Sequence, residues 1–295
     1  MQKSKSPRTS ILLILLALVL AITSTHPAVS QVATPWRLRA SFIDVGQGDS
    51  ALLQDPGGCN VLIDGGSPGK GQVVVAYLRD HGVTHLDAMI ATHADSDHYG
   101  GLTGVLQAAD ISTTAVLYNG YANPASSTWN LFVAAVVSRG LTLTVAGWPT
   151  AYSWCAMTAQ ALNPDPLVPF INDNDASLVL LAQSRGARML FTGDATSIVE
   201  PAIISRSAVG QFPVDVLKVS HHGSKYATSS EFLSVIKSQR AVISVGVNSY
   251  GHPATETLQR LDAAGAIVYR TDISGTIVLE SEGAYTTTLY LPLVR

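Results

Sequence analysis

The chain has 295 residues, 47% of them hydrophobic and 13% charged, which excludes general disorder and allows a sizeable core. Its formal net charge of −3 becomes −6 without the first thirty residues, because they carry three of the 18 basic residues and none of the 21 acidic ones. This charge has the wrong sign for a general nucleic-acid-binding protein, which normally carries a basic patch.

The chain begins with the pattern of an export signal. Lys3, Lys5 and Arg8 form a basic region, an apolar run over 11–22 follows, and Ala28-Val29-Ser30 supplies small residues before a cleavage point. The apolar run is shorter than the about 20 residues that span a membrane comfortably. We therefore expect a signal peptide over residues 1–30, or an uncleaved N-terminal anchor as the only membrane attachment. Either way, the rest of the chain is expected to be secreted or extracytoplasmic.

Short apolar strands alternate with amphipathic helices after this segment, and no linker interrupts the pattern. We therefore predict one domain, residues 36–295. Helices are predicted at Gln72–His81, Trp129–Ser138, Ser229–Lys237 and Ala254–Ala264, with a further helix beginning near Gly101. Strands are predicted at Arg37–Val45, Ser50–Gln54, Cys59–Ile63, Ala88–Ala91, Leu141–Val145, Met157–Leu162, Ser177–Gln183, Arg188–Thr192, Val214–Ser220, Ala241–Val245, Thr276–Glu280 and Tyr285–Leu291.

Cys59 and Cys155 are the only cysteines of the chain. An exported protein can join two such cysteines in a disulfide. Two separately buried thiols fit the sequence equally well, because the sequence gives no distance between them.

The run from His93 to His98 contains two histidines and two aspartates directly after an apolar strand. Carboxylates so close together repel each other, and burial increases the cost, whereas a cation would reverse that balance. A mixture of Asp and His suits zinc, manganese or iron(II) better than calcium. The alternative is a polar turn whose short side chains cap the next helix.

Ionisable residues recur where buried strands end. Asp64, His93, Asp194 and His221 each follow such a strand. Functional sites of α/β proteins collect at these strand ends, so we expect the four residues to lie near one another.

Seven motifs in this order carry a resemblance to a known family: Phe42-Ile43-Asp44-Val45-Gly46-Gln47-Gly48-Asp49-Ser50, Leu62-Ile63-Asp64-Gly65-Gly66, Thr92 to Gly101, Asn174-Asp175-Ala176-Ser177-Leu178-Val179, Leu190-Phe191-Thr192-Gly193-Asp194-Ala195, Leu217 to Ser224, and Tyr250-Gly251-His252-Pro253. Together they resemble the metallo-β-lactamase superfamily, and most of all the hydrolase domain of ComEC-type DNA-uptake proteins and its stand-alone secreted relatives. The resemblance implies an α/β fold of the αββα type, in which helices flank two mixed sheets and metals bind at one edge between the sheets.

The resemblance also implies a centre of two divalent ions, zinc or manganese. The ligands would be His93, Asp95, Asp97, His98, Asp194 and His221. Asp194 would bridge the two ions, and Asp64 would hold a ligand imidazole in place. The chain departs from the common family pattern at Asp95, where a histidine is usual, and over 163–177, where a ligand histidine is missing and Asp175 is the nearest candidate. Both departures leave the metal identity open.

We expect attack by a metal-bound hydroxide on a phosphodiester. Asp97, His222 and His252 are the catalytic candidates, the two histidines as a proton donor or a phosphate contact. His222 and His252 are also alternatives to His221 as a ligand. Lys218 and Lys225 flank the double histidine and are either phosphate contacts or ordinary solvated lysines.

The leading functional prediction is therefore an exported, metal-dependent hydrolase of phosphodiesters, with DNA as the first substrate to test. The first alternative is a hydrolase of small phosphoesters, such as a phosphocholine-type esterase. The second is a non-catalytic metal-binding module that keeps the fold without the chemistry. The sequence gives no sign of a stable protein partner.

Overall fold

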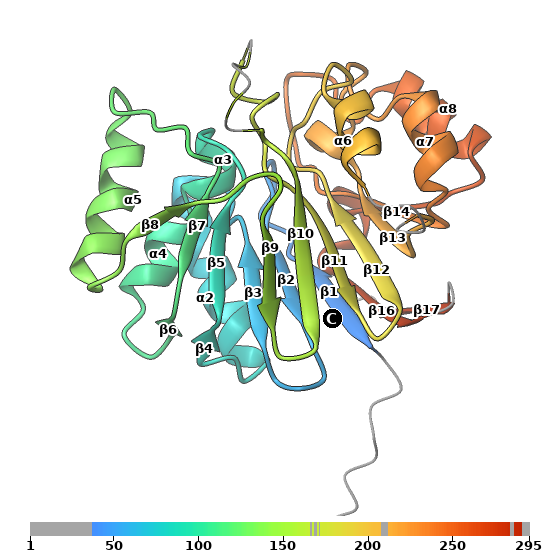
Figure 1. Ribbon diagram of the computed structural model, residues 1–295. Coiled ribbons are helices and arrows are strands. Elements are labelled where there is room, and N and C mark those ends of the chain that lie inside the picture. Colours follow the sequence, from blue (N-terminus) through green and yellow to red (C-terminus); the bar gives the residue numbers. More distant parts are fainter. Residues whose placement is uncertain are drawn as a thin grey trace, which may run out of the picture. The chain divides into compact units, whose positions relative to one another are not determined.

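Two β-sheets lie face to face, with helices on their outer sides (Figure 1). The computed structural model describes residues 37–165, 167, 170, 172–207, 212–283 and 286–290, all within one compact unit, Pro35–Arg295. The predicted export segment, residues 1–30, lies outside the described residues. In the part of the chain that is described, no helix has the length and apolar character needed to cross a membrane.

The first sheet has eight strands and is antiparallel at one side and parallel from β3 onward. Its spatial order is β17 (Thr286–Tyr290), β16 (Ile277–Gly283), β1 (Leu38–Phe42), β2 (Ala51–Gln54), β3 (Asn60–Ile63), β5 (Ala88–Ala91), β7 (Val116–Tyr118) and β8 (Leu143–Val145). A small separate pair joins β4 (His85–Leu86) to β6 (Ser112–Thr113).

The second sheet has seven strands and is also mixed, with its parallel part running from β12 to β15. Its spatial order is β15 (Ile267–Arg270), β14 (Arg240–Ile243), β13 (Val216–Lys218), β12 (Ala187–Phe191), β11 (Val179–Ser184), β10 (Met157–Asn163) and β9 (Ala151–Trp154).

Alternate residues of the strands face different parts of the core. On β5, Ala88 and Ile90 belong to the apolar layer between the two sheets, whereas Met89 packs toward the helices. Phe42 of the first sheet and Phe191 of the second stack across the central layer, with ring centroids 5.9 Å apart. Both faces of each sheet are therefore buried, which explains the nearly continuous apolar runs in the sequence.

The helices cover the two outer faces. The first sheet is covered by α2 (Gly71–Asp80), α4 (Leu102–Gln107) and α5 (Ser127–Ser138), and the second by α6 (Glu200–Arg206), α7 (Ser230–Ile236) and α8 (Thr255–Ala263). The remaining short helices are η1 (Pro68–Lys70), α3 (Ser96–Tyr99), η2 (Ser220–Gly223) and α9 (Thr271–Ser274). Ser126 and Ser229 cap α5 and α7 by accepting hydrogen bonds from the backbone N–H three residues later.

This is the αββα sandwich predicted from the sequence, and the four predicted long helices are present within two residues at each end. The prediction for 214–220 was wrong in one respect that matters for the site. The strand β13 ends at Lys218, two residues before the predicted Ser220, and the chain then turns sharply through η2.

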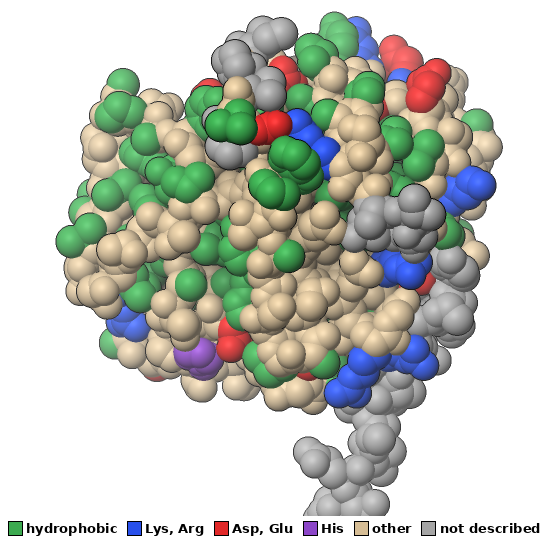
Figure 2. Space-filling model, in the orientation of Figure 1, with side chains coloured by type: hydrophobic (Ala, Val, Ile, Leu, Met, Phe, Trp, Pro, Cys, Tyr) green, Lys and Arg blue, Asp and Glu red, His purple; other side chains and the backbone are tan. Residues whose placement is uncertain are grey.

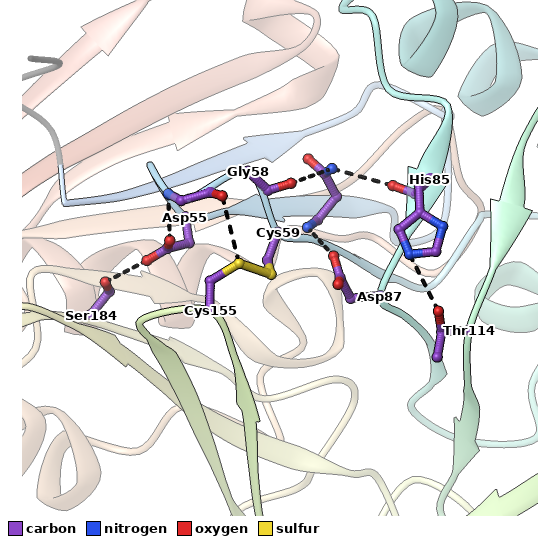
Figure 3. The surroundings of a disulfide bond; sticks show 10 residues. Asp55, Gly58, Cys59, His85, Asp87, Thr114, Cys155 and Ser184 are labelled. Carbon is purple, nitrogen blue, oxygen red and sulfur yellow. Dashed lines mark hydrogen bonds between the residues drawn. A yellow bond between two sulfur atoms is a disulfide. The ribbon is translucent and has the colours of Figure 1, made fainter.

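The two sheets are joined by a disulfide between Cys59 and Cys155 (Figure 3). Cys59 directly precedes β3 of the first sheet, and Cys155 lies in the turn between β9 and β10 of the second. Close to it, Ser184 Oγ donates a hydrogen bond of 2.8 Å to Asp55 Oδ2, which is a second link between the sheets. The sequence left this pairing open, and the structure settles it.

Candidate metal centre

The His93–His98 run lies where the chain leaves β5. Asp95 starts α3 in an extended conformation, but its side chain makes no capping hydrogen bond. Its Oδ2 lies instead 3.4 Å from His93 Nε2. The interpretation of this run as a helix-capping turn is therefore not supported for Asp95.

Asp194, which follows a strand of the second sheet, lies beside the histidines of the His93–His98 run. It follows β12, and its backbone N–H donates to Ser177 Oγ over 3.0 Å. Its Oδ1 lies 3.3 Å from His98 Nε2, and its Oδ2 lies 4.0 Å from His93 Nε2. Residues almost one hundred positions apart thus meet at the edge between the sheets, as the strand-end pattern predicted.

The double histidine reaches this point through a left-handed turn. His221 and His222 have φ values of 49° and 51°, a region that residues with side chains rarely adopt. His222 Nε2 lies 3.4 Å from Asp194 Oδ2 and 3.5 Å from Asp97 Oδ2, and the side chain is buried. His221 Nε2 lies farther from Asp194 Oδ2, at 3.8 Å, and its side chain is 26% exposed.

The turn therefore places His222, rather than the predicted His221, in the buried group of possible ligands. That group consists of Asp49, His98, Asp194 and His222, whose ligand atoms all lie within 4.8 Å of one another. His93, Asp95 and Asp97 adjoin the group through the distances given above.

Hydrogen bonds on the far side of two imidazoles fix which nitrogen faces Asp194. His98 Nδ1 donates to Asp64 Oδ2 over 2.9 Å, and Asp64 is held in turn by the backbone N–H and hydroxyl of Thr92. His222 Nδ1 donates to the carbonyl oxygen of Ser244 over 2.9 Å. In the neutral form of each ring, the proton is on Nδ1 and the lone pair is on Nε2, which then offers an acceptor nitrogen to the cluster. Asp64 thus has the positioning contact that was predicted for it.

Several of these inward-facing atoms have no hydrogen-bond partner although they are buried. They are His93 Nε2, His98 Nε2, His222 Nε2 and Asp194 Oδ1. Buried polar atoms are normally paired, so a convergent group of unpaired ones needs an explanation. Three imidazole nitrogens and a carboxylate oxygen form a donor set that fits zinc and related divalent ions.

The charges in the cluster are strongly coupled. Burial disfavours an ionised Asp194, yet the neighbouring His222 and His98 hold the pKa of this carboxyl well below its usual range. Burial also disfavours a charged His222, but Asp194 and Asp49 outweigh it and raise the pKa of this imidazole to about 9. Without a cation, the carboxylates therefore keep protons on the imidazoles, and a divalent ion would take the place of those protons.

Asp49 was not among the site residues predicted from the sequence, and neither was its ion pair with Lys218. Asp49 Oδ1 lies 3.3 Å from His222 Nδ1, and its Oδ2 forms a buried ion pair with Lys218 Nζ. Asp49 thus lies next to Nδ1 of His222 and, with its Oδ2 3.7 Å from His98 Nδ1, belongs to the buried group itself. Lys218 was considered only as a phosphate contact or a solvated lysine, and its burial excludes the solvated case. The signal in the sequence was the glycine turn before Asp49.

One glycine of that turn is required by close packing. Gly48 has φ +126°, and a Cβ atom there would lie 2.3 Å from the carbonyl oxygen of Asp97. Asp49 N–H also donates to the same carbonyl oxygen over 3.1 Å. Gly48 therefore allows the β1–β2 turn to pack closely against α3, which brings Asp49 to the cluster.

Asp175, the candidate for the missing ligand, does not join the cluster. Its Oδ1 accepts from Thr196 Oγ1 over 2.5 Å, and its Oδ2 accepts from Asn172 Nδ2 over 2.8 Å. Both oxygens are therefore occupied, one by Asn172 of its own loop and the other by Thr196 of the segment after β12.

A cavity of about 180 Å³ opens onto the cluster. His252 lies in its wall, with its ring 5.4 Å from that of His221, and its buried Nδ1 makes no hydrogen bond. Burial and the nearby His221 and His222 lower the pKa of His252. The other lining residues are Gln47, Asp95, Asp97, Asp194, His221, His222 and Tyr250.

Comparison with known protein sequences gives one family. Residues 43–148 match the model of the metallo-beta-lactamase superfamily. The chain is 30% identical over 255 residues to ComE operon protein 3 of Bacillus subtilis (strain 168), covering 80% of this chain and 32% of that protein. It is also 30% identical over 239 residues to competence protein ComA of Neisseria gonorrhoeae, covering 79% and 31%. The chain thus spans about a third of the length of these relatives.

Comparison with solved structures gives the same fold. The metallo-beta-lactamase fold protein YhfI from Bacillus subtilis matches with a TM-score of 0.53 and 12% identity, covering 83% of this chain and 100% of that one. Tm1679, described as a metal-dependent hydrolase of the beta-lactamase superfamily, matches with a TM-score of 0.53 and 14% identity, covering 83% and 99%. At these identities the likeness concerns the fold alone.

Proposed function

Because this chain carries a metallo-beta-lactamase superfamily domain related to competence proteins, we propose that it is a metal-dependent hydrolase of phosphodiesters. The observation that carries the proposal is the convergence of buried, unpaired imidazole and carboxylate atoms at the edge between the sheets. A folded core does not need such a group, because the apolar layers already supply its stability.

The residues present fit two divalent ions that share Asp194. His93 and Asp95 would hold one ion, and Asp97, His98 and His222 the other. Zinc or manganese suits this mixture of nitrogen and oxygen donors. Bound there, such ions supply Lewis-acid polarisation of a phosphoryl oxygen and activation of water.

The chain's own groups contribute position and hydrogen bonding. Asp64 and the Ser244 carbonyl fix the rings of His98 and His222, so their Nε2 atoms need no reorientation. His252 has a lowered pKa and is neutral near pH 7, so its imidazole offers both a donor and an acceptor. We assign the neutral His252 to a hydrogen bond from its ring N–H to a phosphate oxygen.

DNA is the substrate that we put first. A relative of this chain is named a competence protein, and the sequence motifs resemble those of DNA-uptake proteins. Export of the chain is part of the proposal as well. The disulfide Cys59–Cys155 supports it, because disulfides persist in oxidising compartments outside the cytosol.

The test is hydrolysis of bis-p-nitrophenyl phosphate, plasmid DNA and a DNA oligonucleotide by the purified protein. We expect a chelator to abolish hydrolysis and added manganese or zinc to restore it. Asp194→Asn should lower the rate by a factor of at least about 100 with little change in Tm, because it removes the shared ligand. Asp110→Asn is the matched control, since Asp110 forms an exposed ion pair with Arg79.

Chelator-resistant hydrolysis would contradict the mechanism. Metal content well below one ion per chain, together with no hydrolysis, would favour the non-catalytic metal-binding module. Cleavage of bis-p-nitrophenyl phosphate without any cleavage of DNA would favour the hydrolase of small phosphoesters.

A further inference from the structure

A second cavity, of about 520 Å³, lies beside the one that opens onto the cluster. His221, Tyr250 and His252 line both cavities, so the two share part of their wall. We call the outer cavity the tyrosine groove, and its wall includes Lys225, Tyr226, Tyr250 and Glu256. Its volume lies within the range of about 300–1,000 Å³ that is usual for ligand sites.

Two tyrosine rings are exposed at this groove. Tyr226 is 67% exposed and Tyr250 is 74% exposed, although large aromatic side chains are normally well buried. Tyr250 stacks on His252, with ring centroids 5.9 Å apart and an interplanar angle of 27°. Lys225 Nζ lies 5.1 Å from the ring centroid of Tyr226. The groove therefore offers flat aromatic surfaces beside a basic group.

The loop that carries Tyr250 is held in place by one asparagine. Asn248 Oδ1 accepts from the backbone N–H groups of Tyr250 and His252, over 3.1 and 3.0 Å. Asn248 Nδ2 donates to the carbonyl oxygens of Gly246 and His252. The ring of Tyr250 thus projects from a loop that is ordered by its own hydrogen bonds, which reduces the entropic cost of binding to it.

The charges of the groove favour stacking over binding of a duplex. Lys225 and Glu256 have opposite charges and both line the wall. On the face drawn in Figure 2, Lys and Arg side chains lie in small separate groups. Duplex DNA is held mainly by basic groups on its phosphates, whereas single strands are also held by bases that stack on aromatic rings.

We propose that the tyrosine groove binds the bases of a single-stranded nucleic acid, next to the phosphodiester that the metal centre would cleave. Tyr226 and Tyr250 would each stack on a base, and Lys225 would contact a backbone phosphate. This proposal rests on the proposed hydrolase function, and it specifies that the substrate is single-stranded.

The test is a fluorescence anisotropy titration of fluorescein-labelled (dT)12 and of a 12-base-pair duplex in the Asp194→Asn background. We expect (dT)12 to bind more tightly than the duplex. Replacing both Tyr226 and Tyr250 by Ala should weaken binding of (dT)12 by at least about tenfold, because two stacking surfaces are lost. Replacing both by Phe should keep binding within a factor of about two, because the ring faces remain.

Leu131→Ala is the matched surface control, since Leu131 is 62% exposed on α5. The proposal is overturned by absence of (dT)12 binding, by equal binding of the duplex, or by an Ala pair that binds like its parent. Hydrolysis of bis-p-nitrophenyl phosphate by the wild-type chain reports separately on the proposed function. Its absence would remove the hydrolase without deciding the titration.

Discussion

The two histidines after β13 are neighbours in the sequence but have different surroundings. His222 is buried, with Nδ1 bonded to Ser244 and Nε2 directed at Asp194 and Asp97. His221 stays at the open side of the cavity, beside His252. A residue in the left-handed region turns the chain in a way that apolar patterning does not encode. The sequence therefore located the pair but could not decide which histidine faces the cluster.

This difference predicts different effects of two substitutions. His222→Ala should lower hydrolysis by more than about 100-fold and reduce the bound metal, because loss of a ligand exceeds the about 10–100-fold effect of outer partners. His221→Ala should have the smaller effect on both. Metal content by mass spectrometry and initial rates measure this. A larger loss of metal in His221→Ala would restore the ligand set expected from the sequence.

Asp49 and its pairing with Lys218 were missed for a related physical reason. The buried ion pair between them joins the β1–β2 turn to β13, which are far apart in the sequence. A charged residue is buried only when it is paired, and the sequence does not show which partner it will meet. Asp64 was predictable because it follows a strand within a recognisable motif.

At the scale of secondary-structure elements, the apolar runs and their periodicity predicted most of the sandwich. Asp64, His93 and Asp194 follow β3, β5 and β12 within three residues, and this pattern located the site in advance. Elements such as α6 and β15 were not predicted. β15 is only partly buried and lies at the edge of its sheet, so its apolar pattern is weak.

The disulfide links two secondary-structure elements, and it lies at the end of β3 opposite to the metal centre. It joins the start of β3 to the β9–β10 turn, whereas Asp64 follows the opposite end of β3. We expect the Cys59→Ser, Cys155→Ser double variant to lose about 2–5 kcal/mol of unfolding free energy, as is typical for a native disulfide. Its activity well below its Tm should remain.

Thermal unfolding of the wild-type protein with and without a reductant is the companion measurement. Both the reduced protein and the double variant should melt at a lower temperature than the oxidised protein. An unchanged Tm would mean that the disulfide contributes nothing to the thermal stability of the protein.

For the whole molecule, the central claim is that two halves of the chain complete one centre. His93 to His98 come from the first sheet, and Asp194 with His222 come from the second. Neither half holds the full donor set, so the site exists only when the two sheets are packed together. The apolar layer between them, with Phe42 against Phe191, thus fixes the distances at the site.

The most direct measurement is an anomalous difference map from crystals grown with manganese or zinc. We expect strong peaks beside Asp194, within coordinating distance of the Nε2 atoms of His98, His222 and His93. A map with no peak in this cluster, or with metal bound only elsewhere on the chain, would contradict it.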